Sequence, residues 1–271
     1  MAEKSTLKIV ILGCLIIFVL APLAVLIVRS FAVDWHYPGL FPAGLGLRGW
    51  LILFAETGMV DALQTTFLIG CVVAALNLAL GMSAGKALAF YRFKGKELLE
   101  SFFLLPILIP ALALAMGLQI AMIHLGLSNH WPGVVLIHLL PTLPYSIRIF
   151  RAGFENIGLK WEEQAKTLGA GGLTIFMTIY LPLLLPGIRS AASLAFVISL
   201  SQYVLTILIG GGNVVTLSMI YFPYFQGSNQ AVMAAFSLVF ALLPIIFYLG
   251  MELMIKLFVP HHNYFSKKVN L

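Results

Sequence analysis

The chain contains long apolar stretches separated by short polar segments. Because the hydrocarbon core of a bilayer is about 30 Å thick, a helix that crosses it needs roughly 20 apolar residues. Six stretches meet this requirement and predict six transmembrane helices. They run from about Leu7 to Val28, Ala62 to Phe90, Ser101 to Leu127, Trp131 to Ile149, Leu183 to Ile209 and Ala231 to Phe258.

An alternative for the first stretch is a secretory signal peptide. Lys4 and Lys8 precede it, and Ser30-Phe31-Ala32 is similar to a cleavage site. Its apolar run is longer than the roughly 7–15 residues that are usual for a signal peptide. We therefore expect a membrane anchor that is retained.

Composition agrees with this pattern and excludes a soluble or a disordered chain. Apolar residues form 61% of the 271 positions and charged residues 10%, whereas ordinary globular proteins are about 45–50% apolar and about 25% charged. So few charges cannot cover a soluble surface, and a chain with so much apolar surface to bury does not stay disordered. We predict an all-α integral membrane protein with one domain over residues 1–271.

Cysteine and histidine indicate no metal site. Cys14 and Cys71 lie in apolar stretches, where we expect small buried side chains and no disulfide framework. His261 and His262 lie in the polar tail, where we expect them to be surrounded by water.

The distribution of cations predicts the orientation of the chain, because cytoplasmic loops of membrane proteins are rich in Lys and Arg. With both termini in the cytoplasm, 14 cations lie on the cytoplasmic side, and 2, Arg29 and Arg48, lie on the other. The net charge of +6 is then explained by topology and requires no nucleic-acid partner.

Prolines lie inside or beside several predicted spans, among them Pro106, Pro110, Pro182 and Pro186. Proline lacks an N–H group, so a bundle tolerates it only where neighbouring groups satisfy the freed carbonyl. These positions predict kinked helices around a shared interior.

Three motif matches are misleading. Residues 44–49 fit the dinucleotide pattern GxGxxG, but no strand is predicted before them, and we expect a flexible external loop. Residues 81–85 fit the GxSxG nucleophile motif, but they lie inside a predicted helix, where Gly81 and Gly85 favour close helix packing. Residues 81–87 are the closest approach to a phosphate-binding P-loop and have the wrong glycine spacing, so this chain is not expected to bind ATP by that motif.

The most polar part of the chain lies between the fourth and fifth predicted spans, over residues 151–182. From Lys160 to Leu168 the pattern predicts a short amphipathic helix, with Trp161, Ala165 and Leu168 on one face. Gly169 is expected to end it, and a second short helix is predicted from Leu173 to Tyr180, ending at Pro182. The pattern alone fits either a segment that docks a partner or a helix that lies on the lipid surface.

This segment resembles the EAA loop of permease subunits of binding-protein-dependent ABC importers. The pattern of that family is E-A-A, three residues, G, nine residues, I, one residue, L and P. Six residues match it in type and spacing: Glu163, Ala165, Gly169, Ile179, Leu181 and Pro182. Gln164 departs from the second position. Leu105-Pro106 through Pro110 is similar to the family's LPxxxP segment, and the resemblance covers about Asp61 to Leu257.

The resemblance implies a MetI-like bundle of six transmembrane helices in a bacterial inner membrane. Its parts would be a first helix over about residues 7–28, a permease core over about 61–258 and a cytoplasmic coupling loop over about 151–182. Two permeases, identical or different, would surround the pathway. The loop would dock on cytoplasmic ATPase subunits, with Glu163 as the charged contact and Gly169 as the bend between the loop helices.

The same resemblance implies the other components of the system. An external substrate-binding protein, periplasmic or extracellular, would deliver the solute. The chain would not be an enzyme and would hold no cofactor or metal, because Mg-ATP binds to the separate ATPase. The surrounding sequence resembles the branch that handles ferric iron, polyamines, thiamine, sulfate or phosphonates, and no interior charge selects among them.

Polar side chains in the spans are candidates to line the pathway, because facing lipid is costly for them. They are Asn77, Ser83, Gln119, Ser201, Gln202 and Thr206, together with Tyr203, which follows Gln202. We favour the run from Ser199 to Tyr203. The alternative is that each residue makes a hydrogen bond between helices, which contributes about 0.6 kcal/mol.

Two other functions remain to be weighed for a membrane bundle. A secondary transporter driven by an ion gradient would require intramembrane acids or interrupted-helix repeats, and neither is evident in the sequence. An intramembrane hydrolase would require a pair such as Ser and His at the same depth. His124 and His138 are the histidines in the predicted spans, and neither has an evident partner.

Overall fold

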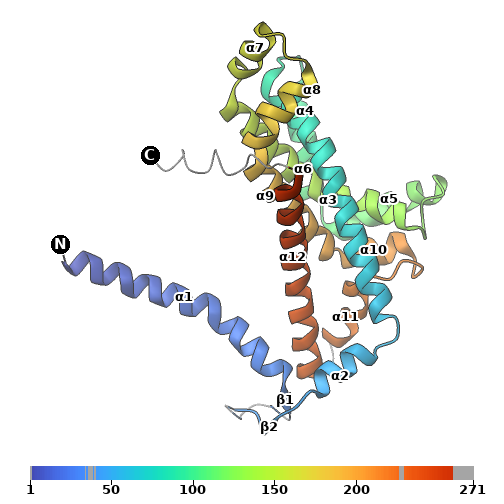
Figure 1. The fold of residues 1–271 in the computed structure, drawn as a ribbon. Helices are drawn as coiled ribbons and strands as arrows, with labels where there is room; N and C mark the ends of the chain where they lie inside the picture. The colour runs from blue at the N-terminus through green and yellow to red at the C-terminus, as the bar shows by residue number, and fades with distance from the viewer. Residues whose placement is uncertain (1, 34, 36–38, 40, 226–228, 259–271) are drawn as a thin grey trace. The chain divides into compact units, whose positions relative to one another are not determined.

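A computed structural model describes residues 2–33, 35, 39, 41–225 and 229–258, and it is almost entirely helical (Figure 1). The helices are α1 (Ala2–Ser30), α2 (Arg48–Ala55), α3 (Met59–Phe90), α4 (Lys96–Leu108), α5 (Ala111–His124), α6 (Trp131–Ile157), α7 (Lys160–Thr167), α8 (Gly172–Ile175), the π-helix η1 (Phe176–Tyr180), α9 (Leu181–Leu200), α10 (Tyr203–Gly210), α11 (Leu217–Phe225) and α12 (Gln230–Phe258). Two short strands, β1 (Ala32–Val33) and β2 (Gly44–Leu45), pair in antiparallel orientation.

Five helical segments among the described residues are long and apolar enough to cross a membrane. They are Ile11–Ser30, Met59–Phe90, Trp131–Ile157, Gly172–Leu200 and Gln230–Leu257. These segments contain or overlap five of the six predicted spans. A count of six crossings and cytoplasmic termini therefore stay predictions, and His261 and His262 lie outside the described residues.

The prediction of one continuous helix from Ser101 to Leu127 is wrong. The structure places two helices there, α4 and α5, and an extended backbone at Ile109 and Pro110 separates them. The proline is the physical reason, because its ring disfavours the helical conformation for the residue before it. The kink predicted at Pro110 is in fact a complete break.

The boundaries predicted around the fifth span are also wrong. Helical structure begins at Gly172 and passes through Pro182, so no helix ends there, and it stops at Leu200, before α10. Just before Pro182, the turn is widened into the π-helix η1, in which the amide of Leu181 donates to the carbonyl of Phe176. A wide turn moves backbone carbonyls away from the proline ring, which in a regular α-helix would clash with the carbonyl four residues earlier.

The expected flexible loop at residues 44–49 is wrong in part. Gly44 and Leu45 pair with Val33 and Ala32 as strand β2, and Arg48 begins helix α2. A ladder of two residues does not form the parallel βαβ unit that dinucleotide binding requires. Ordered structure at this motif therefore gives no support to a cofactor site.

Contacts divide the chain into two compact units. The first contains Met1–Asp61 and Ile220–Leu242, and the second contains Ala62–Met219 with the described residues from Leu243 onward. Within the first, Gly49 of α2 packs so closely on α12 that an added Cβ atom would lie 2.8 Å from the carbonyl oxygen of Ala231. The prediction of a single domain is not tested by this division.

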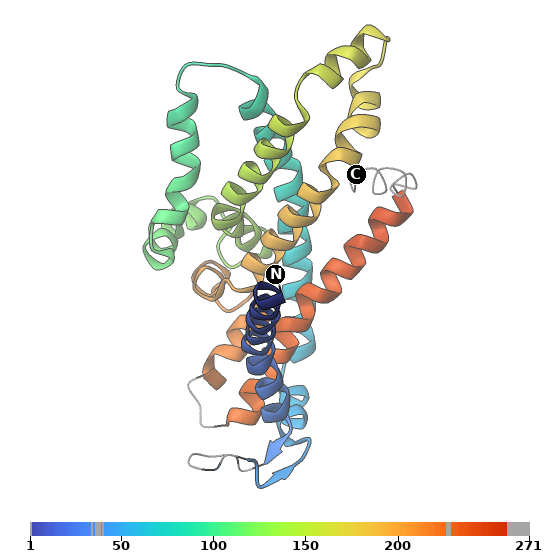
Figure 2. The ribbon, with the colours of Figure 1, turned by 90° about the vertical axis from the view of Figure 1, so that its left-hand side faces the viewer.

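The centre of the second unit is formed by α6 and α9, which lie side by side (Figure 2). Helix α3 packs closely against α6. A Cβ atom added to Gly81 would lie 2.8 Å from the Ser146 Cβ, and one added to Gly85 would lie 2.7 Å from the Phe150 Cβ. This confirms the prediction that these two glycines favour helix packing. One buried cluster, which we call the Phe154 cluster, contains Phe150, Phe154, Ile175, Tyr180, Leu184, Leu185, Ile188, Ala191 and Ile255.

Candidate functional site

The segment that resembles the EAA loop forms one end of the second unit, where α7 and α8 lie (Figure 2). The predicted helix from Lys160 is present as α7, and Gly169 ends it in the left-handed conformation, with a φ of +82°. The Gly169 amide donates to the Lys166 carbonyl at 2.9 Å, and the Ala170 amide donates to the Ala165 carbonyl at 3.0 Å. This is the hydrogen-bonded turn with which glycine commonly ends a helix.

Besides Gly169, the five other residues that match the EAA pattern fall into two groups. Ala165, Ile179 and Leu181 pack against the Phe154 cluster, and Pro182 lies in the first turn of α9. Glu163 is exposed on α7. The apolar members of the pattern therefore attach the segment to the bundle, and the acidic member faces solvent.

Several large apolar side chains of this segment are exposed. Trp161 is 56% exposed and Leu168 is 88% exposed, although the sequence pattern places both on the apolar face of α7. Leu173 and Met177 follow in α8 and η1, and both are more than half exposed. Exposed apolar groups of this size, close to a charged residue, are typical of a surface that contacts a partner or lipid.

One carboxylate that the sequence analysis did not single out organises the base of α7. Glu162 lies 2.9 Å from the Lys86 ammonium of α3 and 2.7 Å from the Lys166 ammonium of α7. The Tyr180 hydroxyl of η1 also donates to it. The Glu162 side chain is 12% exposed, in contrast to the neighbouring Glu163.

The surroundings of Glu162 favour its charged form. Burial alone raises the pKa of a carboxyl group, but hydrogen bonds from Lys166, Tyr180 and Lys86 outweigh burial and lower the pKa of Glu162 to about 2. Only the Lys166 contact could have been predicted from sequence, because residues four positions apart face each other on a helix. Lys86 and Tyr180 are 76 and 18 positions from Glu162, and only the fold brings them to it.

The candidate pathway residue Asn77 is fully buried between α3 and α6. Its amide nitrogen donates to Thr142 Oγ1 at 2.8 Å, and its amide oxygen accepts from Ser146 Oγ at 2.9 Å. Both of its polar atoms therefore have partners on the neighbouring helix. In this chain Asn77 makes the interhelical bonds that were the alternative interpretation for the polar residues in the spans.

His138 of α6 has two partners, so the expectation that it has none is wrong. Its Nδ1 atom lies 2.9 Å from Ser199 Oγ of α9, and its Nε2 atom lies 3.0 Å from Thr206 Oγ1 of α10. All three side chains are buried. The arrangement satisfies both ring nitrogens and ties three helices together, and neither contact is to an acidic residue.

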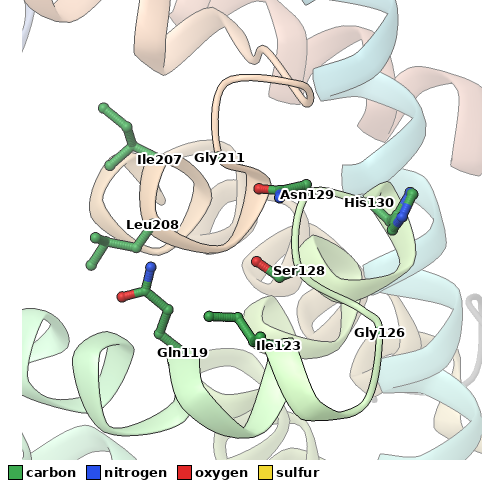
Figure 3. Close-up of a pocket in the computed structure, with 9 residues that line it drawn as sticks. All are labelled: Gln119, Ile123, Gly126, Ser128, Asn129, His130, Ile207, Leu208 and Gly211. Atoms are coloured by element: carbon green, nitrogen blue, oxygen red, sulfur yellow. The ribbon is translucent and has the colours of Figure 1, made fainter.

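Gln119 lies at a hollow between α5 and α10, with a volume of about 590 Å³. Its side chain extends from α5 toward Leu208 of α10, as Figure 3 shows. The turn after α5 closes the far side of the hollow, where Asn129 packs on Gly211. The backbone N–H of Asn129 donates to the Ile209 carbonyl at 2.7 Å.

Ser201, Gln202 and Tyr203 lie at the break between α9 and α10. The Ser201 hydroxyl and the Gln202 side-chain amide donate to the Ile198 carbonyl, at 2.9 and 3.0 Å, and so satisfy an end of α9. Gln202 also lines a second hollow, of about 400 Å³, together with Pro110 at the break between α4 and α5. The structure thus brings the LPxxxP segment and the run from Ser199 to Tyr203 together at this hollow. It places Asn77 and Gln119 elsewhere.

Comparison with known proteins assigns this architecture to a family. The model of the family described as "Binding-protein-dependent transport system inner membrane component" matches residues 77–261. The chain belongs to this family. Members are non-catalytic permease subunits of ABC importers in which separate ATPase subunits hydrolyse ATP, so the buried Ser199 and His138 pair has no catalytic role to fill.

Two curated members of the family illustrate the range of relatives. The molybdate/tungstate transport system permease protein WtpB of Pyrococcus abyssi is 31% identical over 144 residues, which cover 53% of this chain and 58% of that protein. The match thus spans less than two thirds of that relative. The putrescine transport system permease protein PotI of Escherichia coli is 26% identical over 266 residues, which cover 93% of this chain and 92% of that protein.

A solved structure of the same fold is a bacterial alginate ABC transporter in complex with an alginate pentasaccharide-bound periplasmic protein. One of its chains superposes with a TM-score of 0.68 at 14% identity, over 94% of this chain and 95% of that chain. The likeness shows that the two share a fold.

Proposed function

We propose that this permease subunit is driven by cytoplasmic ATPase subunits that dock on the exposed surface around Glu163. The permease is paired with a second permease, identical or different, and the two enclose the pathway. The observation that carries the proposal is the division of the EAA pattern, in which Ala165, Ile179 and Leu181 attach the segment to the bundle while Glu163 stays exposed.

The surface around Glu163 has the composition of a partner interface. Trp161 and Leu168 expose large apolar areas on α7, and Trp is among the residue types that dominate the binding energy of interfaces. A lipid-facing helix would pair such apolar groups with a strongly cationic polar face, whereas Glu162 and Glu163 balance the two lysines of α7, so that its polar face carries no net positive charge. This favours a protein partner over the lipid surface.

The proposed orientation places both termini and the EAA segment in the cytoplasm of a bacterial cell, with the chain in the inner membrane. The asymmetry of 14 cations against 2 supports it. Mg-ATP then binds to the ATPase, on the same side as α7. A periplasmic binding protein delivers the solute from the other side, and the alginate transporter offers a parallel, since it forms a complex with a periplasmic protein that holds an alginate pentasaccharide.

The proposed substrate is a small polar solute. Polyamines belong to the set that the sequence resemblance implies, and putrescine appears in the name of the relative PotI. Sulfate and phosphonate belong to the same set, and the relative WtpB is named for the oxyanions molybdate and tungstate. The candidate pathway residues Gln119, Ser201, Gln202 and Tyr203 are uncharged, so specificity is proposed to reside mainly in the binding protein.

The test is recovery of the ATPase on affinity-purified permease when all subunits are co-expressed. The double variant Glu163→Ala, Gly169→Asp removes the exposed acid and distorts the turn that ends α7, and we expect it to recover little ATPase. Gly171→Ala is the matched control, because Gly171 has a negative φ and its Cβ atom would meet nothing within 4 Å. Equal recovery on the double variant and the control would refute docking at this surface.

A further inference from the structure

Helix α7 is small and polar and contributes no fully buried residue to the core. Ala165 and Ala170 contact the Phe154 cluster, but their small side chains bury little area. Force applied to α7 needs a firmer connection to reach the helices that span the membrane. The contacts of Glu162 supply that connection, since they reach both α3 and η1.

We propose that Glu162 is a positioning residue that ties α7 to α3 through Lys86 and to the α8–η1–α9 helical segment through Tyr180, so that displacement of α7 moves these helices with it. The inference rests on the proposed function, since it assumes that the ATPase acts on α7. It goes beyond that function because it assigns the transmission step to a residue outside the EAA pattern.

The geometry of the three groups suits a tie better than a simple surface ion pair. Glu162 Oε2 accepts from both Lys86 and Tyr180, and the Lys86 ammonium also lies 4.6 Å from the centroid of the Tyr180 ring. Each group of the triangle therefore contacts both others. Three mutual contacts restrict relative motion more than one contact does, and the low exposure of Glu162 reduces screening by water and salt.

Lys166 contacts the same carboxylate but does not transmit motion between elements. It lies on α7 itself, four residues after Glu162, and its side chain is 61% exposed. Exposed pairs within one helix contribute little to stability. Lys166 therefore provides a matched control, because its substitution removes one cation from Glu162 and leaves both connections to other elements.

The test uses the complete transporter, with the permease, the second permease, the ATPase and the binding protein, in lipid nanodiscs. The variants are Glu162→Gln and Lys86→Met, with Lys86→Arg as the conservative variant and Lys166→Met as the control. Two quantities are measured: the ATPase recovered per permease, and the ATP hydrolysis rate with and without the binding protein. Size-exclusion profiles exclude variants that do not fold.

We expect Glu162→Gln and Lys86→Met to recover ATPase as the wild type does, while stimulation of ATP hydrolysis by the binding protein falls at least about fivefold, the lower end of typical coupling between sites. Lys86→Arg is expected to keep most of the stimulation, and Lys166→Met all of it. Unchanged stimulation in Glu162→Gln would refute the positioning role. Loss of ATPase recovery in Glu162→Gln would also refute it, because the residue would then belong to the docking surface.

A second readout is independent of every partner. In the full chain, Cys14 and Cys71 are replaced by Ala, and spin labels are attached at Ser83→Cys of α3 and at Leu168→Cys, just after α7. Both positions are exposed. The labels report the distance between α3 and the end of α7. The account predicts a narrow distance distribution that Glu162→Gln broadens and Lys166→Met does not. A distribution that is equally narrow in Glu162→Gln would overturn the tie, even if docking at Glu163 is confirmed. Loss of docking with an intact tie would instead refute the proposed function alone.

Discussion

Glu162 and Glu163 are neighbours in sequence but occupy different environments. Glu163 is exposed, whereas Glu162 is surrounded by Lys86, Lys166 and Tyr180. Successive residues of a helix point about 100° apart, so one can face the bundle while the next faces solvent. The EAA pattern directs attention to the exposed acid, and only the fold identifies the partly buried one.

The low pKa of Glu162 predicts when the contacts of α7 are lost in acid. Its pKa lies at about 2 instead of 4.5, so its charged form adds stability above pH 4.5, and that stability is lost as the pH falls toward 2. The groups that face it are the Lys86 and Lys166 ammonium groups and the Tyr180 hydroxyl. We expect the spin-label distance distribution between positions 83 and 168 to be constant from neutral pH to about 4.5 and to broaden as the pH falls from there toward 2. In Glu162→Gln the distribution should be broad at every pH, and a pH-dependent change in that variant would contradict the assignment.

Gly169 provides a second prediction at this scale. Its φ of +82° is unfavourable for residues with a Cβ atom, although no neighbour would contact that atom. Gly169→Ala should therefore lower the free energy of unfolding by about 1–2 kcal/mol through backbone strain alone. Gly171→Ala should change it by less than about 0.5 kcal/mol. Thermal unfolding of the two purified variants compares these values, and equal destabilisation would contradict the assignment of the cost to the positive φ of Gly169.

At the scale of whole helices, the sequence predicts most of the elements and misplaces several ends. The spans from Trp131 and Ala231 and the short helix α7 begin within one residue of their predicted positions. The errors concentrate at prolines: Pro110 breaks a helix completely, whereas Pro182 does not end one. Local sequence cannot distinguish these outcomes, because each depends on whether neighbouring groups or a widened turn accommodate the ring.

Packing of α3 on α6 makes a prediction for Gly85. An alanine there would place its Cβ atom 2.7 Å from the Phe150 Cβ and 2.8 Å from the Arg151 amide nitrogen, so the two helices would have to separate. We expect Gly85→Ala to destabilise the protein by about 1–3 kcal/mol. Gly117→Ala in α5 is the control, since nothing lies within 4 Å of its added atom. Thermal unfolding midpoints should fall for the first variant alone, and an equal fall for both would contradict the close approach.

The hydrogen bonds of His138 make a further prediction between helices. Ser199→Ala leaves the His138 Nδ1 atom without its partner and should cost about 1 kcal/mol of stability. Ser190→Ala on the same helix removes a bond to the Pro186 carbonyl within α9 only and should cost less. Transport per folded molecule should be unchanged in both. A loss of transport at unchanged stability in Ser199→Ala would instead indicate that the pair has a role in transport.

At the scale of the whole molecule, composition is sufficient to predict a membrane protein, whereas the orientation inferred from the cation distribution stays a prediction. The EAA pattern alone indicates the family, because six residues over 20 positions match it in type and spacing and such a long match is highly specific. The candidate pathway is less predictable. Asn77 and Gln202 are both polar residues in apolar stretches, yet one is buried between helices and the other lines a hollow. Which of these a polar residue does depends on the neighbouring helices, and the sequence of its own helix does not contain that information.

The central claim, that the surface around Glu163 faces the cytoplasm and binds an ATPase, can be tested at that one position. Glu163→Cys, with Cys14 and Cys71 replaced by Ala, is treated with a membrane-impermeant maleimide in intact cells and in inverted membrane vesicles. The account predicts that Glu163→Cys is not labelled from outside the cell. In inverted vesicles, labelling should rise when the ATPase is stripped from the membrane and fall when the ATPase is added back. Labelling from outside, or labelling of inverted vesicles that is the same with and without the ATPase, would contradict it.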